Sequence, residues 1–248
     1  TLNRDLKVLR GYLTSEFYFC LAEIMQVITN INQIGFEQGI IEMKGFKEKL
    51  NPKIGWQRFV IIYCDVCIFT YQSNLDDSDD KTVEKIMGEI NYLTKPVVSY
   101  LYKVEDWGVF EVLLFRIFVF TFNGEQVNHL LKVAISRTEK ESQLHVMSHL
   151  KIEVIFSSFS YFVNFRHQKW ASEALQLSRR LLKDERDLTS STFQLFYEGW
   201  YTIVFGDKEE GLQSCYQAIS IFKILEQPTL ENRFKVMLEN ILKNKEEP

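Results

Sequence analysis

The chain has 248 residues, of which 46% are hydrophobic and 14% aromatic, so a sizeable core is expected. A formal net charge of −4 and a pI near 5.7 argue against the clustered basic excess of a nucleic-acid-binding face. The most hydrophobic stretch, Val109–Phe122, is interrupted by Glu111 and Arg116, so no apolar run reaches the roughly 18 residues that span a bilayer. With no secretory signal visible, the expected location is the cytoplasm.

Helical periodicity dominates the chain, and no convincing alternation for strands is found. Breaks are expected at Asn51–Pro52, Pro96 and Pro228, with connections of about two to eight residues between antiparallel neighbours. The sequence therefore predicts an all-α fold. Helices are expected at about 15–30, 33–48, 54–72, 81–93, 105–121, 125–137, 140–166, 169–185, 188–205, 208–226 and 230–243.

Small residues near the end of the chain follow a repeat spacing. Gly199, Gly206, Gly211 and Ala218 lie seven, five and seven residues apart, which matches the small positions of a tetratricopeptide-type repeat of roughly 34 residues. Two helices approach closely only where small residues face each other, and Gly206 is expected in the turn between them. A more degenerate unit lies upstream, at Glu173–Leu175. The sequence predicts a right-handed solenoid of degenerate helical hairpins that enclose a groove; the alternative is an ordinary hairpin that holds three glycines.

Two residue pairs have spacings typical of metal or redox chemistry. Cys64 and Cys67 form a CxxC pair, but a second such pair or a matching histidine pair is missing, so buried thiols are the preferred interpretation. His145 and His149 lie one helical turn apart, and Glu141 and Glu153 extend the same face by one turn on each side. A polar surface stripe or groove lining is preferred over a metal site. A sensing role for either pair is kept as a third hypothesis. We expect no metal and no cofactor.

Enzyme activity has no positive evidence in the sequence. No nucleophile elbow and no phosphate-binding glycine loop is present. The most suggestive features are instead polar and aromatic side chains within apolar helices. A buried Arg116 would need a partner, either internally, with Glu111 or Glu153, or from an extended peptide in a groove. The candidate groove residues are Arg116, Ser157, Ser158, Tyr161, Asn164, Tyr197 and Tyr201.

Two blocks of the sequence resemble the C-terminal regulatory domain of the Rgg/GadR/MutR transcription regulators of Gram-positive bacteria. The resemblance covers roughly residues 85–240, and the Trp-Gly-x-aromatic-Glu element is its more diagnostic part. The first block consists of Tyr100-Leu101-Tyr102, Trp107-Gly108, Phe110-Glu111 and Leu114-Phe115. The second block consists of Tyr197, Gly199, Gly206, Gly211, Ala218-Ile219 and Leu225.

The resemblance implies an α-solenoid that binds a short, often hydrophobic signalling peptide in its concave face. Arg116 and Asn164 would anchor the peptide backbone, with Ser157 and Ser158 beside them and Tyr161, Tyr197 and Tyr201 packing peptide side chains. The sequence departs from the family pattern at 155–160, which holds no Asn, and at Arg116–Ile117, where a small and polar pair is common.

The resemblance also implies a homodimer and an N-terminal helix-turn-helix domain that reads DNA. Residues 1–17 are predicted to be the tail of that missing domain, and residues 18–248 the tetratricopeptide-like sensing and dimerisation domain. The final amphipathic helix is predicted to form the dimer interface, because its apolar stripe has nothing after it to cover it. That stripe consists of Phe234, Met237, Leu238 and Ile241.

The predicted function is therefore that of a quorum-sensing regulatory domain without enzyme activity or membrane association. It would contact DNA only through the separate N-terminal domain. The alternative is a helical-repeat scaffold that uses the same groove for a protein partner and binds no small peptide. A free octapeptide should suffice as ligand for the first function and not for the second.

Overall fold

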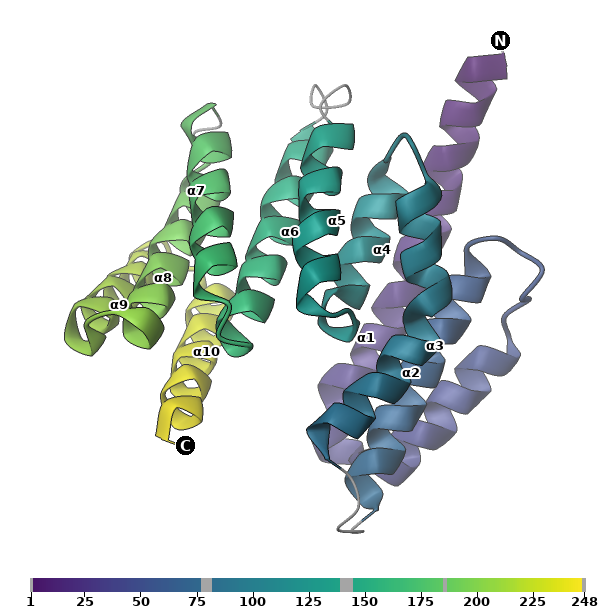
Figure 1. Cartoon of the computed structure of the whole chain (residues 1–248), viewed down its shortest axis with the longest axis horizontal. Coiled ribbons are helices and arrows are strands. Elements are labelled where there is room, and N and C mark those ends of the chain that lie inside the picture. The colour runs from purple at the N-terminus through teal and green to yellow at the C-terminus, as the bar shows by residue number, and fades with distance from the viewer. Residues whose placement is uncertain (1, 77–81, 139–144, 185–186, 247–248) are drawn as a thin grey trace. The chain divides into compact units, whose positions relative to one another are not determined.

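The computed structural model describes residues 2–76, 82–138, 145–184 and 187–246. All elements in these ranges are helical, which confirms the predicted all-α class. The chain divides into two compact units, 1–126 and 127–248. The labels of Figure 1 are used for their helices.

Within its described residues, unit 1 contains four α-helices and a short 3-10 turn. Helix α2 packs against both α1 and α3, and α4 also contacts both of these helices. The Asn51–Pro52 break separates α1 from α2 as predicted. The elements are α1 (Leu2–Glu48), α2 (Gln57–Leu75), α3 (Val83–Lys103), α4 (Val109–Phe118) and η1 (Val119–Thr121).

Helix α1 is longer than the two helices predicted for this part of the chain. It runs from Leu2 without a gap past residue 17, and the division of the chain at residues 17 and 18 stays a prediction. Gly35 interrupts the helical geometry with φ 81° and ψ 161°, a left-handed φ that favours glycine. The predicted division of this segment into two helices is therefore found as a kink at Gly35.

The Pro96 boundary was wrong, because α3 continues through this proline to Lys103. A proline inside a helix leaves the carbonyl four residues earlier without its N–H partner. Here that residue is Tyr92, which is 73% exposed, and Pro96 is exposed as well. Water can therefore satisfy the carbonyl on this face of the helix.

The Trp-Gly-x-aromatic-Glu element begins α4. Trp107 is buried at 1% exposure, and the Gly108 amide donates to Glu111 Oε2 at 2.8 Å. The other carboxylate oxygen of Glu111 accepts from the Tyr100 hydroxyl at 2.8 Å. This element therefore caps α4 and ties it to α3, which explains why these residue types occur together.

The described part of unit 2 contains six helices, of which α5 begins just before the boundary. The closest pairs are α6 with α7 and α8 with α9; α7 also packs on α8, and α10 packs on α8 and α9 (Figure 1). The helices are α5 (Gly124–Arg137), α6 (His145–Asn164), α7 (Gln168–Asp184), α8 (Leu188–Phe205), α9 (Lys208–Ile224) and α10 (Pro228–Glu246).

The predicted small residues close the α8–α9 hairpin. A Cβ atom added at Gly211 would lie 2.6 Å from both the Gly199 oxygen and the Ile203 nitrogen. A Cβ atom added at Gly199 would lie 2.7 Å from the Gly211 oxygen and 2.8 Å from Cys215 Sγ. Ala218, further along α9, is fully buried. The backbones of the two helices thus touch where the repeat spacing places glycine.

The turns of unit 2 use different C-terminal geometries. Gly206 caps α8 in the predicted turn, with φ −135° and ψ −140°, outside the helical and extended regions. Left-handed residues instead end α6 and α9, at Arg166 (φ 60°) and Glu226 (φ 54°). In both cases the next amide bonds back to the carbonyl five positions earlier in the Schellman pattern, as His167 does to the Phe162 carbonyl at 2.7 Å.

The apolar stripe of α10 lies largely inside unit 2. Phe234 is 1% exposed and packs on Phe196 and Phe222, with ring centroids 4.6 and 5.2 Å apart. The premise that nothing covers this stripe was wrong, because α8 and α9 cover it. A dimer contact through α10 stays a prediction for whatever part of the stripe remains accessible. The predicted residues are Phe234, Leu238 and Ile241, which are buried, and Met237, which is half-buried.

Candidate functional site

Helix α6 presents a single polar stripe to the surface. His149 and Asn164 are exposed, and Glu153, Ser157 and Ser160 are partly exposed, at successive spacings of four, four, three and four residues. These spacings keep all five side chains on one face of the helix. His149 Nε2 lies 3.6 Å from Glu153 Oε1. The structure therefore brings Ser157 and Asn164 together on one open face.

Three other predicted groove residues lie in the core of unit 2. Ser158 is fully buried, Tyr161 is 3% exposed and Tyr197 is 6% exposed. Tyr197 stacks on Phe156 with ring centroids 4.4 Å apart and meets Phe159 edge to face at 5.4 Å. Burial raises the pKa of the Tyr161 phenol. A ligand would reach these three side chains only after the helices rearrange, so their part in binding stays a prediction.

A pocket lies between α7 and α8, with a volume of about 490 Å³. Of the predicted groove residues, only Tyr201 lines it, and the Tyr201 ring also packs on Phe205 with centroids 5.1 Å apart. Every lining residue is polar. The others come from α7: Gln168, Lys169, Ser172, Glu173 and Gln176.

The two charged residues that line this pocket differ in whether they have an ion-pair partner. The carboxylate of Glu173 lies 3.6 Å from the ammonium group of Lys132 on α5. Lys169, in contrast, forms no ion pair or hydrogen bond through its side chain with any residue that the structure describes. The pocket therefore carries a partly compensated negative charge and an uncompensated positive one.

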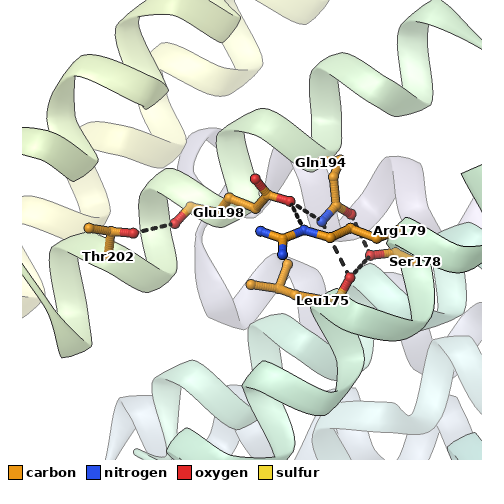
Figure 2. Close-up of polar contacts among 6 residues, drawn as sticks. All are labelled: Leu175, Ser178, Arg179, Gln194, Glu198 and Thr202. Atoms are coloured by element: carbon orange, nitrogen blue, oxygen red, sulfur yellow. Dashed lines mark hydrogen bonds and ion pairs between the residues drawn. The ribbon is translucent and has the colours of Figure 1, made fainter.

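A chain of hydrogen bonds joins α7 to α8 (Figure 2); it is buried at Ser178 and exposed at Arg179. Ser178 Oγ bonds the Leu175 carbonyl at 2.9 Å and the side-chain oxygen of Gln194. The Gln194 amide donates to Glu198 Oε1 at 2.5 Å, and Arg179 Nε donates to the same oxygen at 2.5 Å. The hydrogen bond with Glu198 raises the pKa of Arg179. This chain fixes α7 against α8 at one edge of the pocket.

The sequence predicted only one of the residues that line the pocket. Tyr201 was selected because an aromatic residue with a polar tip interrupts an apolar helix. The α7 residues were missed because polar side chains at successive helical turns are typical of any exposed face. Only the packing of α8 beside α7 distinguishes this face from an ordinary solvated one.

Arg116 lies in unit 1, where it is half-buried in α4. The other predicted groove residues lie in unit 2, and each unit is described by itself. A shared groove that includes Arg116 therefore stays a prediction.

The cysteine pair lies in the core of unit 1. Burial raises the pKa of both Cys64 and Cys67 to about 12, so neither thiol is readily available as a thiolate. All four cysteines are free thiols. Among the described residues no group of three His, Cys, Asp or Glu side chains could hold a metal ion. The side chain of His145 and the whole of Glu141 lie outside the described residues.

The fold is an all-helical domain of hairpins with close small-residue contacts. It carries a polar pocket on its surface. Residues 57–236 match the family described as "HTH-type transcriptional regulator Rgg, C-terminal domain". The chain therefore belongs to this family of transcription regulators. No helix within the described ranges is both long and apolar enough to cross a membrane.

Solved structures support the fold. A Listeria monocytogenes EGD-e protein named as a candidate transcriptional regulator gives a TM-score of 0.66 at 16% identity, covering 88% of this chain and 73% of that one. The Streptococcus dysgalactiae SHP pheromone receptor Rgg2 gives 0.62 at 17% identity, covering 88% and 75%. The protein RopB gives 0.63 at 18% identity, covering 95% and 97%. A search of curated protein sequences gives no match.

Proposed function

We propose that this chain is the peptide-sensing domain of a cytoplasmic quorum-sensing transcription regulator, and that unit 2 binds the peptide. The observation that carries the proposal is the polar α7–α8 pocket in a domain that belongs to a transcription-regulator family. A structure with the same fold is named as a pheromone receptor, which supports a signalling molecule as the ligand.

The accessible residues have different expected roles in peptide binding. The pocket offers amide, hydroxyl and ammonium donors to the polar groups of a peptide. Ser157 and Asn164, on the exposed stripe of α6, would bond an extended backbone. Tyr197 would act indirectly, by holding α8 against α6, and Tyr161 by packing on Phe165 and His167 at the end of α6, unless binding opens the core.

Signalling would follow from differential affinity. A ligand shifts a conformational equilibrium only as far as it binds one state more tightly than the other. In this proposal the chain forms a homodimer, and the peptide favours one dimer conformation, which repositions DNA-binding heads carried by a separate N-terminal helix-turn-helix domain. The hydrogen bonds that join α7 and α8 are suited to such a role, because a ligand in the pocket touches both helices.

Native mass spectrometry of the chain, with and without short hydrophobic peptides from the source organism's culture, tests this proposal. We expect a dimer that gains roughly 0.8–1.5 kDa per subunit, which corresponds to about seven to thirteen residues. A chain that takes up no peptide but retains a larger protein partner would contradict the proposal and favour the scaffold function. Scrambled peptides of the same composition serve as the control for non-specific uptake.

A further inference from the structure

The side chains that line the α7–α8 pocket have few partners within the protein. The side chains of Gln168, Lys169, Ser172 and Gln176 form no hydrogen bond or ion pair with any described residue, and neither does the Tyr201 hydroxyl. Each of these five groups donates hydrogen bonds. The Lys169 ammonium can only donate, and the amide and hydroxyl groups can donate or accept, so the hollow can bond a ligand rich in oxygen acceptors.

The charges decide which acceptor fits best. Glu173, the acidic residue of the lining, lies 3.6 Å from the ammonium group of Lys132, so its charge is partly compensated. Arg179, one turn beyond Gln176, is likewise engaged, because its Nε donates to Glu198 at 2.5 Å. Lys169 is thus the one lining residue whose charge has no counterpart among the described residues. A negative group entering the pocket gains an ion pair, whereas a positive group is repelled.

We propose that this pocket binds a carboxylate of the peptide ligand, and this inference rests on the proposed function. Lys169 forms the ion pair, and Ser172 and Tyr201 donate hydrogen bonds to the carboxylate oxygens. Charge-assisted bonds of this kind are roughly twice as strong as neutral ones, so they would fix the orientation of the bound peptide. The carboxylate comes either from the free C-terminus of the peptide or from an Asp or Glu side chain.

Three small probes separate these sources in an amide chemical-shift titration of the ¹⁵N-labelled chain. N-acetyl-dileucine carries a terminal carboxylate, N-acetyl-aspartyl-leucinamide carries a side-chain carboxylate, and N-acetyl-dileucinamide carries none. We expect saturable shifts at α7 and Tyr201 with at least one carboxylate probe, and at least about fivefold weaker binding of the uncharged probe. Equal affinity for all three probes would overturn the inference.

Variants assign the carboxylate to named residues. Lys169→Gln should weaken binding of the carboxylate probe about fivefold to tenfold, because it removes the charge and keeps a donor. Tyr201→Phe should weaken it about twofold to threefold and keep the ring contact with Phe205. Lys183→Gln, on an exposed part of the same helix outside the pocket, is the matched control and should have no effect. Unchanged affinity in Lys169→Gln would overturn the assignment.

The two proposals fail in distinguishable ways. Suppose that native mass spectrometry shows uptake of a culture peptide and that acid and amide probes bind with equal affinity. Peptide sensing would then be supported, and the proposed carboxylate site would be contradicted. Saturable carboxylate binding that depends on Lys169, without uptake of any culture peptide, would support the pocket and count against peptide sensing.

Discussion

Helix α8 meets its two neighbouring helices in different ways. Toward α9 the backbones touch, because Gly199 and Gly211 have no Cβ atom and the space between the helices would not hold one. Toward α7 the contact is made through side chains, since buried Gln194 and Ser178 bond each other and leave a pocket beside Tyr201. The first interface is specified by shape and the second by hydrogen bonding.

The difference separates a rigid part of unit 2 from a part that can respond to a ligand. Backbones in contact cannot move closer, and small shifts forfeit dispersion contacts along both helices. A hydrogen-bonded chain with one exposed end, at Arg179 and Glu198, tolerates small displacements and exchanges partners with solvent or ligand. We therefore expect substitutions at the α8–α9 contact to reduce the free energy of unfolding more than substitutions at the α7–α8 contact.

The largest effect is expected at the glycine contact. Gly211→Ala places a methyl group 2.6 Å from backbone atoms of α8, so the helices must separate. We expect a loss of unfolding free energy of about 3 kcal/mol or an insoluble chain, measured by urea denaturation. Gly88→Ala is the matched control, because this glycine is helical and exposed with open space around it. It should stabilise the chain by about 0.5–1 kcal/mol. A Gly211→Ala chain as stable as the parent would contradict the contact.

An intermediate effect is expected from the buried chain between α7 and α8. Gln194→Met keeps the volume but leaves Ser178 Oγ and the Leu175 carbonyl with fewer partners. We expect a loss of about 1–3 kcal/mol in unfolding free energy, measured by urea denaturation. Adding Ser178→Ala to this variant should cost less than Ser178→Ala alone, because the orphaned hydroxyl is then absent. Strict additivity of the two substitutions would mean that the two side chains are not coupled.

The smallest effect is expected at the exposed end of that chain. The Arg179 side chain is 57% exposed, so solvent screens its pair with Glu198. Arg179→Gln should reduce the unfolding free energy by about 0.2–1 kcal/mol, and the reduction should shrink at high salt. Arg180→Gln, an exposed neighbour outside the network, should change nothing. A salt-independent loss would place Arg179 in the core interface instead of at its edge.

The sequence by itself determined the helical class, the close approach of α8 and α9, and the family. Each of these follows from local spacing. Helical period fixes which residues share a face, glycine at repeat positions permits backbone contact, and the Trp107-Gly108-x-aromatic-Glu111 element caps its own helix.

Only the tertiary structure decided which polar and aromatic side chains are accessible. Tyr197 and Tyr201 are one helical turn apart on α8, yet Tyr197 is buried against α6 and Tyr201 lines the pocket beside α7. The apolar stripe of α10 is likewise covered by α8 and α9, where the sequence predicted an open surface. A sequence pattern shows which face of a helix is apolar or polar, but burial depends on which neighbour packs there, and that is set by contacts between segments far apart in the chain.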